Sequence, residues 1–248
     1  MRNFQARGLV IGTSPMGEID RLVTLYTCEQ GKIKAKAPGA RKIKSKLAAG
    51  VDMLTCSNFS LYRGRTMATI TQVEPEFSFP KIRGKVKDYA LGMFFSELVD
   101  KVVEEEAADP FIFELMLGSL HLLNESSIDR EILKHYFTLK LLFLIGYTPH
   151  IKDCINCGEK EAPFYWHLGA EGFYCEKCSP ANPPRFKISR GTHALVRRMI
   201  YSAPGKIITL RGTKEQKEEL GSFIHYFLHY WIDPGAFKTL SFLKKIEK

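Results

Sequence analysis

The hydrophobic and polar positions along the first third of the chain alternate with a period of two residues. Such alternation places one face of a strand in a core and the other in solvent. The predicted strands are Ala6 to Thr13, Leu22 to Thr27, Lys32 to Ala37, Val51 to Tyr62 and Thr66 to Glu74. Five short strands separated by turn residues predict a small closed barrel, and both an OB-fold and an SH3-like barrel fit the pattern.

From Asp88 onward the apolar positions recur every three or four residues, as Leu91, Phe94 and Leu98 do, which is typical of helices that bury one face. Further helices are predicted from Phe111 to Leu123 after the start signal Asp109-Pro110, from Ser127 to Leu144, and from His193 to Tyr201. Thr213 and Gln216 have the spacing of a capping box, which predicts the start of a last helix.

Four cysteines form two C-x-x-C pairs, Cys154 with Cys157 and Cys175 with Cys178, and 17 residues lie between the pairs. This spacing is typical of a zinc ribbon, and the aromatic stretch between the pairs predicts a hairpin that brings them together. Four thiolates fill a tetrahedral shell, so we expect one structural Zn²⁺ ion with no position for a reacting water. Disulfides and unmetallated thiols are the alternatives, and the expected cytoplasmic location argues against disulfides.

Positive charge is concentrated near the start of the chain. Residues 1–87 contain 16 Lys and Arg and 6 Asp and Glu, a net charge of +10, whereas residues 88–248 contain 20 and 21, a net charge of −1. The stretch from Gly31 to Leu47 carries seven cations and no acid: Lys32, Lys34, Lys36, Arg41, Lys42, Lys44 and Lys46.

The first three of these lysines alternate along a predicted strand, so we expect their ammonium groups to line one solvent-facing side. Pro38 and Gly39 then end the strand and begin a mobile basic loop. Arg63 and Arg65 lie on the adjoining predicted hairpin, next to Tyr62, which is expected in the core. Such a surface suits a phosphate backbone; the competing interpretation is an edge strand whose lysines prevent pairing with another sheet.

Enzyme motifs in the sequence are incomplete. Gly12 and Gly17 have the glycine spacing of a phosphate-binding loop, but Glu18 and Ile19 follow where Lys and Ser or Thr are required. His167 does not begin the H-x-E motif of a zinc deaminase. We therefore expect a protein that is not an enzyme and has no small-molecule substrate.

The longest uninterrupted apolar run, Leu141 to Ile145, is far shorter than the roughly 18 residues of a membrane-spanning helix. The first residues also lack the apolar region and cleavage site of a signal peptide. A cytoplasmic protein without a membrane partner is expected.

With a barrel, a basic loop, helices and a four-cysteine segment in this order, the chain resembles the RecO family of bacterial recombination mediators and DNA repair proteins. The resemblance rests on Gly17 to Thr27, Gly31 to Ile33, Gly39 to Leu47, Leu61 to Gly64 and Thr69 to Glu74, and extends over essentially the whole chain. It implies an OB-fold over residues 1–80, a helical domain divided between residues 81–150 and 185–248, and an inserted zinc-ribbon-like segment over residues 151–184.

The resemblance also implies binding of single- and double-stranded DNA in the nucleoid, annealing of complementary strands, and loading of recombinase, together with RecR, onto DNA coated by single-strand-binding protein. The predicted DNA contacts are the seven cations of the Gly31 to Leu47 stretch with Arg63 and Arg65. Arg197 and Arg198 are predicted to bind the C-terminal tail of single-strand-binding protein. The competing hypotheses are a zinc-stapled protein-interaction adaptor and, less favoured, a nuclease or ligase accessory enzyme.

Overall fold

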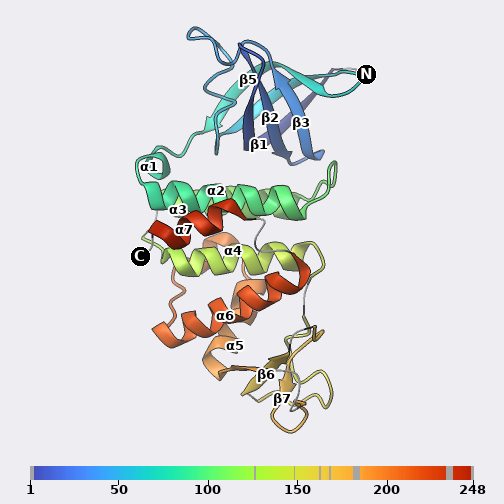
Figure 1. Cartoon of the computed structure of the whole chain (residues 1–248), viewed down its shortest axis with the longest axis vertical. Coiled ribbons are helices and arrows are strands. Elements are labelled where there is room, and N and C mark those ends of the chain that lie inside the picture. Colours follow the sequence, from blue (N-terminus) through green and yellow to red (C-terminus); the bar gives the residue numbers. More distant parts are fainter. Residues whose placement is uncertain are drawn as a thin grey trace. The chain divides into compact units, whose positions relative to one another are not determined.

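The computed structural model describes residues 3–125, 127–147, 149–161, 163–167, 169–180, 185–232 and 237–246. The chain forms two compact units, Met1–Glu125 together with Thr239–Lys248, and Ser126–Lys238 (Figure 1). The first unit combines the barrel with the helices that follow it. The sequence predicts a different division, into residues 1–80, 81–150, 151–184 and 185–248, and this division stays a prediction. None of the helices in the described part of the chain is long and apolar enough to cross a membrane.

The first unit contains a closed five-stranded barrel. Its strands are β1 (Asn3–Met16), β2 (Asp20–Thr27), β3 (Gly31–Ala37), β4 (Cys56–Arg63) and β5 (Ala68–Phe77). They pair in the order β1-β2-β3-β5-β4, and β4 returns to β1. The β3–β5 pair is parallel and the others are antiparallel. This is the strand order of an OB-fold, so the choice that the sequence pattern left open is decided by the pairing.

A bulge in β1 lets this one strand pair with two neighbours. Residues Asn3 to Leu9 pair with β4, and the pairing with β2 shifts register between Val10 and Gly12. A bulge bends a strand and increases its twist, which helps a small barrel to close. The inward side chains are fully buried, including Leu9, Val23 and Phe59 at 1% exposure or less.

The predicted strand from Val51 was wrong in its first part, because β4 begins only at Cys56. Residues 51–55 form a buried turn in which Leu54 has a φ of 59°. The Leu54 N–H donates to the Val10 carbonyl, and the Val10 N–H donates to the Thr55 carbonyl, both at 3.0 Å. The apolar residues of this segment are therefore buried in a turn beside the β1 bulge, and they do not form a strand.

Four helices complete the first unit: α1 (Pro80–Arg83), α2 (Val86–Val102), α3 (Pro110–Glu125) and α7 (Lys238–Ile246), the last from Thr239 onward. The predicted apolar face of α2 is buried, including Phe94, Phe95 and Leu98. The α3 start is confirmed, since Asp109 accepts a hydrogen bond from the Phe111 N–H at 2.8 Å.

The second unit contains α4 (Arg130–Leu144), α5 (Arg190–Tyr201), the 3-10 helix η1 (Pro204–Ile207), α6 (Lys214–Trp231) and a three-stranded sheet. The sheet has the order β7-β6-β8, formed by β7 (Tyr174–Cys175), β6 (Phe164–His167) and β8 (Arg185–Ile188). The predicted hairpin is the β6–β7 pair, and β8 was not expected. The capping box of Thr213 and Gln216 is confirmed at the start of α6.

We predict that two glycine substitutions separate backbone strain from steric conflict. Gly17 and Gly31 both have left-handed φ values, 67° and 66°. A Cβ on Gly17 would meet nothing within 4 Å, whereas a Cβ on Gly31 would lie 2.4 Å from the Ala107 carbonyl. Gly17→Ala should therefore lower the free energy of unfolding by about 1 kcal/mol, and Gly31→Ala by about 3 kcal/mol or more. Urea unfolding of both variants measures the difference; equal losses would contradict it.

Candidate functional site

The structure distributes the nine predicted DNA-contact cations over three segments of the barrel. They are β3 itself, the basic loop (residues 38–47) that follows it, and the end of β4 with the β4–β5 turn. Whether each cation is available to a ligand depends on the partner that the chain itself provides.

The three β3 lysines differ in exposure: Lys34 is exposed and Lys36 partly exposed, whereas Lys32 is nearly buried. The Lys32 side chain is 9% exposed, and its Nζ donates to the Asp100 carbonyl oxygen at 2.5 Å. Lys34 Nζ lies 2.5 Å from Glu105 Oε1, and Lys36 Nζ lies 2.8 Å from Asp20 Oδ2. The expectation that all three ammonium groups line a solvent-facing side was wrong for Lys32, and acids from other parts of the chain lie against Lys34 and Lys36. Contact of these lysines with DNA stays a prediction.

One of these partners, Glu105, lies in the segment between α2 and α3, here called the acidic connection (residues 103–109). It forms a parallel bridge between Lys32 and Glu105, and the Glu106 N–H donates to the Lys32 carbonyl at 3.0 Å. The buried Tyr26 hydroxyl accepts from the Asp109 N–H at 3.2 Å, which fixes the far end. The side-chain hydrogen bond to Lys34 lowers the pKa of the Glu105 carboxyl. One part of the β3 surface is thus covered by the chain's own anions.

Backbone hydrogen bonds between residues close in sequence hold the basic loop. The Lys42 N–H donates to the Gly39 carbonyl and the Ser45 N–H to the Lys42 carbonyl, both at 3.0 Å. Arg41 attaches the loop to the β1–β2 turn: its N–H donates to the Ile19 carbonyl, and its guanidinium donates to the Gly17 carbonyl, both at 2.9 Å.

The cationic side chains of this loop are accessible to solvent. Arg41, Lys42, Lys44 and Lys46 are all exposed. Among the residues that the structure describes, no carboxylate forms an ion pair with Lys42, Lys44 or Lys46. These three side chains are therefore exposed without an ion-pair partner in the described part of the chain.

Arg63 and Arg65 lie near the opposite end of β3 from the basic loop. Arg63 donates to Gln30 Oε1 at 2.8 Å and its guanidinium carbon lies 5.3 Å from the centre of the Phe4 ring. Both arginines are exposed and line a hollow of about 330 Å³ together with Lys34 and Glu105. Tyr62, expected in the core, is 36% exposed.

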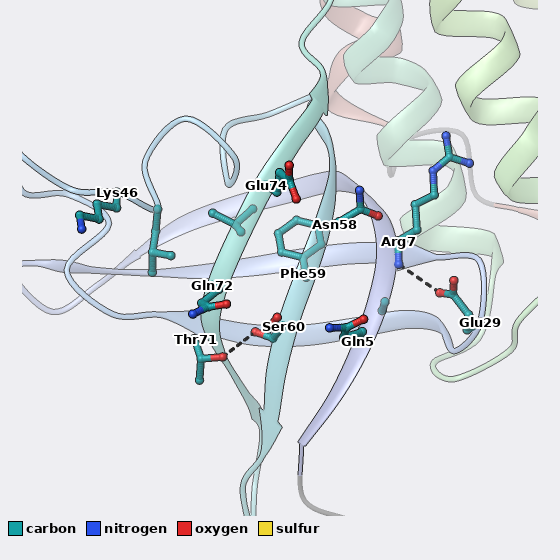
Figure 2. Close-up of a pocket in the computed structure, with 13 residues that line it drawn as sticks. Gln5, Arg7, Glu29, Lys46, Asn58, Phe59, Ser60, Thr71, Gln72 and Glu74 are labelled. Atoms are coloured by element: carbon teal, nitrogen blue, oxygen red, sulfur yellow. Dashed lines mark hydrogen bonds between the residues drawn. The ribbon is translucent and has the colours of Figure 1, made fainter.

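A polar groove of about 840 Å³ was not anticipated from the sequence. Figure 2 shows outward-facing side chains of β1, β4 and β5 that line it, with Lys46 of the basic loop at its margin. They include Gln5, Asn58, Ser60, Thr71, Gln72 and Glu74. The available signal was the alternation of amide and hydroxyl residues on the solvent side of these strands. Amides both donate and accept hydrogen bonds, so this groove can accommodate varied polar ligands.

The four predicted metal ligands are brought together in the second unit. Their sulfur atoms all lie within 4.8 Å of one another, and the sulfurs of Cys157 and Cys175 are 3.6 Å apart. Tetrahedral coordination with metal–sulfur bonds of about 2.3 Å requires sulfurs about 3.8 Å apart. Gly158 has a φ of 75°, and its N–H donates to the Cys154 carbonyl at 2.9 Å, which closes the first knuckle. The residues present therefore fit a four-sulfur metal site.

The thiols differ in how readily they ionise. Burial opposes ionisation of Cys154, but backbone N–H groups, first that of Cys175, lower the pKa of its thiol to about 6. The backbone of Glu159 favours the Cys157 thiolate, but its three sulfur neighbours outweigh this and raise its pKa to about 12. A divalent cation requires all four sulfurs as thiolates, so its binding releases protons.

Arg197 and Arg198 lie on α5 and are exposed. Tyr201, one turn further along, is 54% exposed. A hollow of about 580 Å³ in the same unit is lined by apolar side chains that include Tyr147, Tyr201 and Phe227. The two arginines are not among its described lining residues, so their role as a peptide contact stays a prediction.

Comparison with known proteins gives a consistent result. The family model "Recombination protein O N terminal" matches residues 1–79, and "Recombination protein O C terminal" matches residues 83–241. A DNA repair protein RecO from Bacillus velezensis is 32% identical over 244 residues, covering 98% of this chain and 94% of the relative. Proteins of the same name from Alkaliphilus metalliredigens and Bacillus subtilis are each 30% identical, cover 98% of this chain, and are covered over 99% and 94% of their own lengths.

The cysteine cluster predicts a metal-binding result. Replacing Cys154 and Cys175 by Ser removes one buried sulfur from each pair, so Co²⁺ affinity should fall by at least about a hundredfold, with loss of the sulfur-to-cobalt absorption band. Cys28→Ser, a change at a half-exposed thiol of the barrel, is the matched control and should bind Co²⁺ like the parent. Undiminished Co²⁺ binding by the double variant would contradict this assignment.

Proposed function

Because the chain belongs to the RecO family of DNA repair proteins, we propose that it binds single- and double-stranded DNA through its barrel and acts as a recombination mediator rather than as an enzyme. Its work is on chromosomal DNA in the cytoplasm. The observation that carries the proposal is the basic loop, whose Lys42, Lys44 and Lys46 are exposed without a paired acid in the described chain.

The primary contact is between the basic loop and phosphates. Lysine and arginine that neutralise phosphates release condensed counterions, and this release supplies most of the affinity when no base sequence is recognised. The net charge of +10 over residues 1–87 adds long-range attraction for a polyanion. Arg41 belongs to this contact because its guanidinium is exposed. The same guanidinium also attaches the loop to the β1–β2 turn.

Four of the remaining predicted cations form a secondary contact: Lys34, Lys36, Arg63 and Arg65. Lys34, Arg63 and Arg65 border one hollow, in which Glu105 competes with a phosphate for Lys34. Lys36 is held by Asp20 close to the basic loop. Lys32 is buried and contributes chiefly structure. DNA therefore has to displace Glu105 before Lys34 takes part, and Asp20 before Lys36 does.

Annealing of complementary strands requires no bond-making chemistry. A cationic surface that holds two strands reduces their mutual repulsion and raises their local concentration, and base pairing then proceeds by itself. In this proposal the protein acts with RecR and displaces single-strand-binding protein so that recombinase can load. Arg197 and Arg198, exposed on α5 near Tyr201, are suited to the acidic, apolar tail of single-strand-binding protein.

We further propose that the ion held by the four cysteines is Zn²⁺. Sulfur ligands in a tetrahedral set favour zinc, and four of them leave no coordination position for a water or substrate. The ion would therefore stabilise the segment around β6 and β7 and take no part in chemistry.

Charge reversal of the basic loop tests the proposed function. The triple variant Lys42→Glu, Lys44→Glu, Lys46→Glu should weaken single-stranded DNA binding at least about a hundredfold at about 0.1 M salt. It should also reduce the slope of log affinity against log salt concentration by about 2. Lys152→Glu, Lys160→Glu and Lys206→Glu combined make the same charge change at exposed sites of the second unit. Equal effects in both triple variants, or none, would favour an adaptor without direct DNA binding.

A second prediction concerns the acidic connection. Glu105→Gln removes the partner of Lys34, so DNA affinity should rise about two- to fivefold. Glu104→Gln removes the same charge from the neighbouring exposed position and should raise affinity less. Fluorescence anisotropy with a labelled oligonucleotide measures both; indistinguishable affinities for the two variants would reject specific competition for Lys34.

A further inference from the structure

Ile43 is the most exposed large apolar side chain among the described residues, with a relative exposure of 104%. It lies at the centre of the basic loop, directly between Lys42 and Lys44. Burial in the core therefore does not account for an apolar residue at this position. Ile19, at the β1–β2 turn to which Arg41 ties the loop, is a second exposed apolar residue at 45%.

The loop presents Ile43 on a defined backbone. The Lys42 N–H and the Ser45 N–H each donate within the loop at 3.0 Å, one on either side of Ile43. The Gly39 N–H also donates to Asp20 Oδ1 at 2.7 Å, which anchors the start of the loop to the barrel. The isoleucine is thus projected into solvent by an ordered turn.

The cations around Ile43 indicate which kind of ligand would bind there. Arg41, Lys42 and Lys44 attract a polyanion, and the apolar side chain between them requires an apolar surface close to the anionic groups. Stacked bases next to phosphates provide this combination, and apolar side chains inserted between base steps are a known way for proteins to unstack nucleic acid. The polar groove bordered by Lys46 offers amide and hydroxyl partners to an unstacked base. An anionic lipid surface has no bases to place in such a groove.

We propose that Ile43 is a wedge that inserts between neighbouring bases of a bound DNA strand, with Lys42 and Lys44 holding the flanking phosphates. This inference rests on the proposed DNA-binding function and adds a local distortion of the strand to it. The local distortion is the unstacking of one base step, which costs free energy that the flanking phosphate contacts offset.

The test uses the full-length protein and a single-stranded oligonucleotide containing 2-aminopurine, whose fluorescence rises when its base unstacks. At saturating protein the parent should raise the fluorescence. Ile43→Ser should abolish at least about half of this rise and weaken binding about three- to tenfold, while the salt slope stays unchanged because every cation remains. Because Ile43 is fully exposed, its replacement should leave thermal unfolding unchanged.

Val86→Ser is the matched control, since Val86 is 68% exposed between Lys85 and Lys87 at the start of α2. It should retain the full fluorescence rise. The wedge is rejected if Ile43→Ser keeps the rise at saturation, if Val86→Ser loses it equally, or if Ile43→Ser loses only binding to vesicles containing anionic phosphatidylglycerol. Salt-dependent DNA binding by the parent without any fluorescence rise rejects the wedge alone, whereas absence of DNA binding rejects the proposed function.

Discussion

Closure of the barrel through β1 is the constraint on which the arrangement of the cationic segments depends. β1 pairs with β4 along its first half and with β2 along its second, and the bulge near Val10 allows the bend between them. With β3 and β5 paired in parallel, no strand of the barrel is left as a free edge. The β3 lysines are therefore not protection for an open edge, and the loop after β3 meets the β1–β2 turn because both leave the same end of the β2–β3 pair.

Identical side chains in one basic stretch have different roles because their surroundings differ. Lys32 is nearly buried and bonded to Asp100, so its ammonium group is satisfied by the fold. Lys34 and Lys36 keep partial exposure with one acid each, and a surface pair of this kind is worth little and is weakened by salt. Lys42, Lys44 and Lys46 have no such partner among the described residues and retain their attraction for phosphates. The cations thus become more available to phosphates along the chain from β3 into the basic loop.

The four-cysteine segment has more of an apolar core than a metal staple alone requires. Trp166 of β6 is 1% exposed, and its ring lies 5.4 Å from that of Phe223 and 5.7 Å from that of Phe227, both on α6. Phe173 and Phe164 are also fully buried. Aromatic packing holds one side of the small sheet against α6, while the sulfur cluster fixes the knuckles. Metal binding and helix packing therefore share the stabilisation of this segment.

The sequence by itself determined the barrel strands apart from residues 51–55, the starts of α3 and α6, the cysteine cluster and the concentration of positive charge. These features follow from local chemistry: two-residue alternation, capping residues, and ligand spacing act over a few neighbouring positions. Only the tertiary structure decided the OB-type strand order, the third strand β8, the acid partners of Lys32 and Lys34, and the polar groove. Glu105 lies 71 residues from Lys34 along the chain, so its pairing depends on how α2 packs against the barrel, which no local pattern encodes.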